Sequence, residues 1–262
     1  MREQMTKFIR IDPDGGREAV MRSVAIEAPI AIEINGIGYA VMMATPDELV
    51  DFAHGFVWSE RLVDAADEIL SIDHDPSGQG HRLRIQIAPI RTDRLLERFR
   101  HRMSDSSCGI CGIENLEQAM RPLPMLPTGR LIDDAAIFRA LADLRERQPL
   151  NAATGAVHAA ARCGTDGGII EVREDVGRHN AFDKLIGAMM RAGETWGDGF
   201  ALLSSRCSYE LVEKAALSGC PTLVTISAPT SLAVERARGA GIRLIVLARS
   251  DAVLADAVLS PT

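Results

Sequence analysis

Residues 200–247 read FALLSSRCSYELVEKAALSGCPTLVTISAPTSLAVERARGAGIRLIVL and decide the fold class. Short apolar runs alternate here with amphipathic stretches. Strands separated by helices of roughly ten residues form β-α-β units, which build a mostly parallel sheet with helices on both faces. The expected elements are, in order, a strand at Phe200–Leu203, a helix at Ser208–Leu217, a strand at Thr222–Ile226, a helix at Ser231–Arg238 and a strand at Leu244–Leu247.

The residues before this stretch continue the alternation. We expect a helix from Asp133, a helix of small residues at 154–161, a strand at 169–172 and a helix at 180–191. A proline-rich stretch at 122–129 precedes them and marks a change of architecture. The chain therefore divides into an N-terminal α+β domain (1–104), a loop and linker (105–130) and an α/β domain (131–262).

The N-terminal half carries hairpin signals instead. Asn35-Gly36 separates two apolar runs and is the strongest short signal for a β-hairpin. Thr45 and Glu48 have the spacing of a capping box and predict the start of a helix. Gly55, inside that helix, indicates close packing. The polar first ten residues are expected to be frayed.

The composition excludes several classes of protein. The chain has 262 residues and a formal net charge of −7, which gives no general reason to bind nucleic acid or an acidic membrane. No run approaches the roughly 18 apolar residues of a membrane span, and no apolar signal segment follows Met1. Five cysteines, an odd number, favour a reduced cytoplasmic protein over a secreted one.

Two of the cysteines, Cys108 and Cys111, lie in the stretch SSCGICG at residues 106–112. Such a C-x-x-C pair can share a metal ion or form a reversible disulfide. One thiol can also attack and remove a group bound to the sulfur of the other. A basic run from Arg91 to Arg102 precedes it. That run is either a solvated helix face or an electropositive approach that lowers the pKa of a thiol.

Metal chemistry fits this pattern poorly. A structural zinc site has four ligands, and the chain has a single C-x-x-C. A zinc deaminase would have H-x-E ahead of its cysteine pair, whereas His158 is followed by two alanines. A thioredoxin-like redox pair stays open, although a charged segment precedes it. The isolated cysteines are expected to be buried and inert; they are Cys163, Cys207 and Cys220.

Three polar turns follow predicted strands of the α/β half, at residues 173–180, 204–206 and 227–231. Ligands of open parallel sheets bind at the carboxyl ends of the strands, where turns lead into helix N-termini. Gly, Arg, Ser and Thr in such turns can hold phosphate. Each of Asp175 and Thr230 could instead simply cap a helix, but clustering of the turns favours a site for a phosphorylated ligand.

From about Glu27 to Arg249 the sequence resembles the FdhD family of formate dehydrogenase accessory sulfur carriers. The motifs that carry the resemblance include SCGICG at 107–112, TGAVHAA at 154–160, REDVGRHN at 173–180 and APTSLA at 228–233. The resemblance implies a cytidine-deaminase-like, three-layer α/β domain with a mostly parallel sheet and no deaminase metal site, plus a smaller N-terminal α+β domain.

The resemblance also implies a cytoplasmic homodimer that acts as a sulfurtransferase. It would accept sulfur from a cysteine desulfurase as a persulfide on Cys108. It would pass the sulfur to the molybdenum bis(molybdopterin guanine dinucleotide) cofactor needed by formate dehydrogenase, and a guanine nucleotide is expected to fit the same site. Cys111 would relay the sulfur, protect it, or only shape the loop. A chaperone that holds the cofactor without transferring sulfur is the alternative.

The expected catalytic residues are therefore Cys108 and Cys111, with no metal ligand. Arg61 and Ser205 stand where the family has glycine, and Leu247 where it has an aromatic residue. The expected cofactor-binding residues are Leu247, Ala248, Arg249, Ser250, Asp251, Ala252, Thr154, Gly155, His158, Asp175, Gly177, Arg178, His179, Asn180, Lys184, Ser204 and Arg206.

Overall fold

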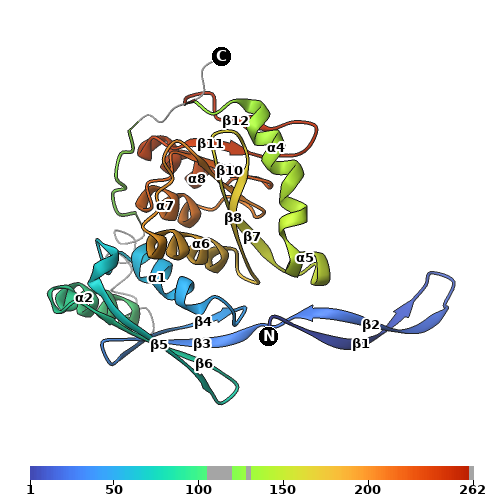
Figure 1. The fold of residues 1–262 in the computed structure, drawn as a ribbon, viewed down its shortest axis with the longest axis horizontal. Coiled ribbons are helices and arrows are strands. Elements are labelled where there is room, and N and C mark those ends of the chain that lie inside the picture. The colour runs from blue at the N-terminus through green and yellow to red at the C-terminus, as the bar shows by residue number, and fades with distance from the viewer. Residues whose placement is uncertain (105–119, 128–130, 260–262) are drawn as a thin grey trace.

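Three sheets organise the protein. The computed structural model describes residues 1–104, 120–127 and 131–259. A six-stranded sheet forms the C-terminal half, a four-stranded sheet the N-terminal half, and a two-stranded ribbon the N-terminus. The six-stranded sheet and its helices stack over the four-stranded sheet, and the ribbon extends away from both (Figure 1).

The six-stranded sheet has the order β12-β11-β10-β9-β7-β8. Strands β9, β10 and β11 run parallel, which confirms the β-α-β units expected over residues 200–247. The sheet as a whole is mixed, because β7, β8 and β12 pair antiparallel with their neighbours. A loop as short as the one between β7 and β8 can join only antiparallel strands. The strands are β7 (His158–Cys163), β8 (Ile169–Asp175), β9 (Phe200–Leu203), β10 (Thr222–Thr225), β11 (Arg243–Val246) and β12 (Leu254–Ala255).

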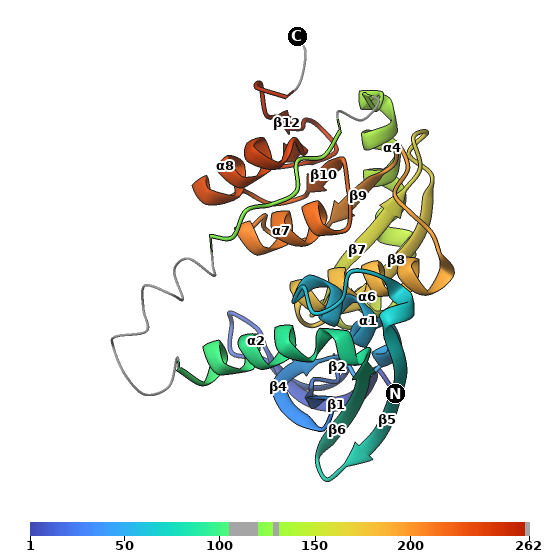
Figure 2. The same ribbon diagram turned by 90° about the vertical axis from the view of Figure 1, so that its left-hand side faces the viewer.

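Helices cover both faces of this sheet and give the expected three layers (Figure 2). Leu185, Leu211 and Ala237 are buried with one face of the sheet. Ile137 and Leu144 are buried with the other. The helices are α4 (Asp134–Leu144), α5 (Pro149–Thr154), α6 (Arg178–Ala192), α7 (Tyr209–Leu217) and α8 (Ser231–Ala240), with a 3-10 turn at Arg145–Arg147.

One expected helix of this half is wrong. A helix is expected over residues 154–161. In the structure helix α5 ends at Thr154, Gly155 follows it with φ 68°, and strand β7 begins at His158. Alanine favours helices only weakly, and tertiary packing overrides the preference. Ala160 and Ala161 are fully buried on opposite faces of the sheet, between its two helical layers.

The N-terminal half is an antiparallel-rich sheet with helices α1 and α2. Its order is β4-β3-β6-β5, and β3 pairs parallel with β6. The predicted hairpin is confirmed: Asn35 and Gly36 join β3 to β4 with φ 49° and 79°, both of the sign that a type I′ turn requires. The elements are β3 (Ala28–Ile34), β4 (Ile37–Ala44), α1 (Leu49–Ser59), β5 (Ile69–Ser77), β6 (Gly80–Ile87) and α2 (Thr92–Ser104), with 3-10 turns at Ala66–Glu68 and Pro89–Arg91.

The N-terminal residues are ordered strands and not the frayed end that was expected. Strands β1 (Glu3–Ile11) and β2 (Arg17–Ala25) pair antiparallel along their whole length. The sequence shows no clear alternation here, because most side chains of the ribbon are exposed, the apolar ones included, and no buried face marks the strands. Among the residues that the structure describes, no helix is long and apolar enough to cross a membrane.

Helices α1 and α6 hold the two halves together. A Cβ atom on Gly55 would lie 1.8 Å from the carbonyl oxygen of Asp183, and one on Gly187 would lie 1.9 Å from that of Asp51. The close packing expected at Gly55 is therefore confirmed. This contact fixes α1 of the N-terminal half against α6, the helix that follows the turn after β8.

Candidate functional site

The polar turns meet at one edge of the six-stranded sheet. Strand β8 runs in the same direction as β9, since both are antiparallel to β7. The carboxyl ends of β8, β9, β10 and β11 therefore share this edge with the amino end of β7. Backbone amides link the turns in a row, from Ser204 N to Ala159 O (3.0 Å), Ser227 N to Ser205 O (3.4 Å) and Leu247 N to Ser227 O (3.3 Å).

We call this edge the strand-end site; it comprises residues 154–158, 175–179, 204–206, 227–231 and 247–252. The expected clustering of the turns is thus confirmed, whereas the binding of a ligand there stays a prediction.

Positive charge gathers around His158 within this site. Burial lowers the pKa of His158, and the charges of Arg178, His179 and Arg206 lower it further, while Asp175 opposes them. Coulomb effects of this kind require the groups to be neighbours. The Nε of Arg178 is buried and has no hydrogen-bond partner among the described residues. An anion at the amino end of α6 would satisfy that donor, as phosphates do at other helix N-termini.

His179 is oriented by two side chains at the start of α7, the N-cap Ser208 and Glu210, which were not expected as site residues. Its Nε2 lies 3.2 Å from a carboxylate oxygen of Glu210 and 3.4 Å from the hydroxyl oxygen of Ser208. The hydrogen bond with His179 is the largest cause that holds the pKa of Glu210 at about 2, below its usual value. Sequence spacing could not reveal this pair, because His179 and Glu210 belong to different helices.

Three expected ligand contacts are instead buried in the seam between the two halves. Lys184 and Asp175 have fully buried side chains, and Asn180 is 3% exposed. The ammonium group of Lys184 lies 2.7 Å from the Asp175 carboxylate and donates to the carbonyl oxygen of Thr45 at 3.0 Å. Asp175 also accepts from the amide of Gly177 (2.8 Å) and from Asn180 Nδ2 (3.0 Å). These side chains hold the turn at 175–178 in place, and contact of any of them with a ligand stays a prediction.

Thr45 belongs to the same buried cluster, which corrects the expected capping box. Its amide donates to Asp175 at 3.0 Å, and its hydroxyl oxygen accepts from the amide of Val176 at 3.2 Å. Helix α1 begins later, at Leu49, and Glu48 at its N-cap position has φ 52° with no side-chain cap. Thr45 therefore contacts a distant part of the chain instead of capping α1, and the local sequence does not reveal this contact.

The remaining residues expected on the β7 side lie around its amino end. The hydroxyl of Thr154 donates to the carbonyl oxygen of Leu150 at 2.8 Å, and Gly155 is exposed. The hydroxyl oxygen of Ser204 accepts from the amide of Ala159 at 2.8 Å and so ties β7 to the turn after β9.

The expected C-terminal segment follows β11 directly. Leu247 has φ 49°, a strained left-handed conformation for a residue with a side chain, and such strain clusters at functional sites. Ala248 is buried, and its amide donates to the carbonyl oxygen of Thr225. The residues that follow are exposed at the edge of the site; they are Arg249, Ser250, Asp251 and Ala252.

The structure describes three of the five cysteines. Cys108 and Cys111 lie outside the described residues. The three described cysteines are buried as expected, and burial raises the pKa of each thiol to about 12. Among the described residues, no group of three His, Cys, Asp or Glu side chains could hold a metal ion.

The basic run before the C-x-x-C is partly neutralised. Arg94 pairs with Asp64 at 2.8 Å, and Arg98 pairs with Glu60 at 3.3 Å. These arginines brace α2 against the turn after α1. The side chains of Arg100 and Arg102 are outside the described residues, so a role of the run in ionising a thiol stays a prediction.

Comparisons with known proteins place the chain in a family. The profile of the FdhD/NarQ family matches residues 25–255. A protein named sulfur carrier protein FdhD from Xanthomonas euvesicatoria pv. vesicatoria is 48% identical over 236 residues, which are 90% of this chain and 84% of the relative. One of the same name from Variovorax paradoxus is 42% identical over 228 residues, covering 87% and 82%.

The fold has a solved counterpart. The crystal structure of a provisionally named formate dehydrogenase accessory protein from Desulfotalea psychrophila has a TM-score of 0.76 and covers 97% of this chain and 96% of that one, at 24% identity. With a profile match across most of its length and relatives above 40% identity, the chain belongs to the FdhD/NarQ family.

Proposed function

We propose that this protein is a sulfur carrier that serves formate dehydrogenase. It accepts sulfur from a cysteine desulfurase as a persulfide and transfers it to the molybdenum bis(molybdopterin guanine dinucleotide) cofactor, which it binds as its substrate. The relatives named sulfur carrier protein FdhD support the carrier role, since they are 42–48% identical over most of the chain. We further propose that it acts in the cytoplasm as a homodimer.

Cys108 is the proposed carrier, and Cys111 relays the sulfur, protects it or only shapes the loop. The attacking group in persulfide transfer is a thiolate, and the described cysteines are too buried to ionise. In the proposed step the Cys108 thiolate attacks the outer sulfur of the donor persulfide. A new S–S bond forms on Cys108, the old S–S bond breaks, and the desulfurase cysteine leaves as a thiolate.

The observation that carries the acceptor half of the proposal is the strand-end site. Arg178, His179 and Arg206 lie around His158 at the amino end of α6, and the buried Nε of Arg178 lacks a partner among the described residues. This arrangement suits the pyrophosphate of a guanine dinucleotide. The exposed residues 249–252 border the same edge. In the delivery step the S–S bond on Cys108 would break, the outer sulfur would pass to the acceptor at the sulfide level, and Cys108 would return to the thiolate. The cofactor, when bound in a reduced form, would supply the two electrons that this step requires.

Sulfur loading tests the proposal. The wild type, Cys108→Ala and Cys111→Ala are incubated with a desulfurase and cysteine and then weighed by intact-protein mass spectrometry. We expect a mass increase of one sulfur that is lost in Cys108→Ala. An active donor that leaves the wild type unloaded would contradict the carrier mechanism and favour a chaperone that only holds the cofactor. A disulfide between Cys108 and Cys111 without loading would indicate a redox protein.

Nucleotide binding tests the acceptor site separately. Guanosine diphosphate is titrated calorimetrically into the wild type, Arg178→Gln and the control Arg139→Gln, whose exposed side chain is on α4. Loss of one charge-assisted contact should weaken binding about tenfold in Arg178→Gln only. Equal binding by all three proteins would place the nucleotide elsewhere.

A further inference from the structure

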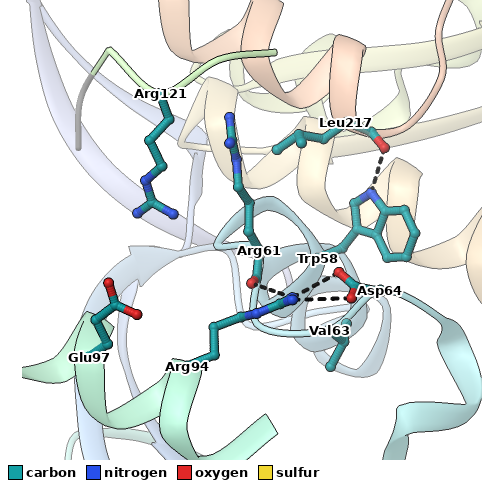
Figure 3. A pocket seen from close by; sticks show the side chains of 8 residues that line it. All are labelled: Trp58, Arg61, Val63, Asp64, Arg94, Glu97, Arg121 and Leu217. Carbon is teal, nitrogen blue, oxygen red and sulfur yellow. Dashed lines mark hydrogen bonds and ion pairs between the residues drawn. The ribbon is translucent and has the colours of Figure 1, made fainter. Parts of the chain in front are cut away.

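A cavity of about 500 Å³ lies between α1, α2 and α7. It is at the C-terminal end of α7, whereas the strand-end site includes residues near the N-terminal end of that helix. Figure 3 shows the side chains that line it; they are Trp58, Arg61, Val63, Asp64, Arg94, Glu97, Arg121 and Leu217.

One cation of the cavity, Arg121, has no ion-pair partner among the described residues. Arg94 is satisfied, because its two Nη atoms donate to Asp64 at 2.8 and 3.1 Å. The guanidinium of Arg121 reaches into the cavity from the other side (Figure 3) and makes no ion pair with any described residue. Its Nη2 atom is buried and lacks a hydrogen-bond partner within the described chain. A buried charged donor without a partner is costly, which makes Arg121 the group in this cavity best suited to bind an acceptor on a ligand.

Arg61 adds a second unused donor in the same wall. Its Nη2 donates to Glu213 at 2.5 Å and its Nη1 to the carbonyl oxygen of Pro122 at 3.1 Å, but its Nε is buried and has no partner in the described residues. Its backbone has φ 57°, a left-handed conformation that favours glycine. Arg61 therefore carries a guanidinium at a backbone position of the kind that clusters at functional sites.

The opposite part of the lining is apolar and rigid. The indole Nε1 of Trp58 donates to the carbonyl oxygen of Leu217 at 3.0 Å, which holds the ring in place, and Val63 is 3% exposed beside it. Pockets for small molecules commonly combine an apolar wall with a few polar groups that orient the ligand, and 500 Å³ is within their usual range.

We propose that this cavity binds a small-molecule oxyanion, a carboxylate or a phosphate, attached to an apolar or aromatic body. The oxyanion takes the free donors of Arg121 and Arg61, and the body lies against Trp58, Val63 and Leu217. The described lining of the cavity shares no residue with the strand-end site, and the proposal does not depend on sulfur transfer.

The test uses the full chain with phenyl phosphate and benzoate as probes, which share a ring and differ in the oxyanion. Binding is followed by calorimetry and by tryptophan fluorescence; the chain has two tryptophans, and Trp196 is only 5% exposed in the core. We expect saturable binding of at least one probe with a change in fluorescence, weakened about tenfold in Arg121→Gln. The matched control Arg139→Gln, whose exposed side chain is on α4, should bind the probe as the wild type does. Arg178→Gln is measured beside it to report any binding of the probe at the strand-end site.

Two results would overturn the inference. The first is the absence of saturation by either probe up to roughly 10 mM, where even a weak pocket would fill. The second is binding that Arg178→Gln weakens and Arg121→Gln does not, since it would assign the probe to the strand-end site. Whichever probe binds through Arg121 identifies the oxyanion.

Discussion

Lys184→Met should destabilise the protein strongly without removing any surface contact. The Lys184 ammonium is fully buried, 2.7 Å from the equally buried Asp175 carboxylate. Removal of one partner of a buried ion pair costs about 3–5 kcal/mol, because the other charge stays buried and unpaired. Asp175 keeps hydrogen bonds from Gly177 N, Asn180 Nδ2 and Thr45 N. We therefore expect a loss near the lower end, about 3 kcal/mol in the free energy of unfolding.

Urea unfolding of the wild type, Lys184→Met, Asp175→Asn and the double variant measures this loss. Asparagine keeps the shape and one acceptor of the aspartate but not its charge. The loss of unfolding free energy in the double variant should therefore be smaller than the sum of the two single losses, by a coupling energy of about 1–3 kcal/mol. A loss below about 1 kcal/mol in Lys184→Met, or strict additivity, would refute the assignment of a structural ion pair. Unchanged stability with weakened nucleotide binding would restore Lys184 as a ligand contact.

Three further outcomes are expected. Gly55→Ala should lower the free energy of unfolding by about 3 kcal/mol or more, because its Cβ would overlap backbone atoms of α6. The control Gly38→Ala, whose Cβ would have no atom within 4 Å, should lower it by less than roughly 0.5 kcal/mol. Equal urea midpoints for the two variants would contradict this packing. The pKa of Glu210 in the folded protein is about 2, below its ordinary 4.5, so the ionised carboxylate stabilises the folded protein fully above pH 4.5 and less and less as the pH falls towards 2. Acid unfolding of Glu210→Gln, followed against pH, should lack this loss of stability. An acid unfolding profile identical to that of the wild type would refute the contribution of Glu210. Iodoacetamide should alkylate native protein only at Cys108 and Cys111, as read by peptide mass spectrometry, since the other thiols are buried; rapid labelling of a buried thiol would disprove their inertness.

Local patterns predicted the elements whose cause is local. The alternation over residues 200–247 gave three parallel strands and two helices because each strand is short, apolar and bounded by polar turns. Asn35-Gly36 marked its hairpin because few other residue pairs adopt two successive positive φ angles.

Elements decided by distant contacts were missed. Residues 158–161 look helical by composition but form a strand, because only small side chains fit between the two helical layers there. The N-terminal ribbon was missed because both of its faces are largely exposed and leave no alternation to detect.

The candidate site divides in the same way. The sequence by itself determined which turns follow the strands, and a sheet with strands in one direction must bring those turns to one edge. Tertiary structure alone decided which of their side chains remain available: Arg178, His179 and Arg206 surround His158, while Asp175 and Lys184 are buried against Thr45. The reason is that a charged side chain is either buried in the contact between the two halves or free to meet a ligand, depending on what packs against it. Here the deciding contact is the packing of α1 on α6, which joins residues far apart in the sequence and so cannot be predicted from local patterns.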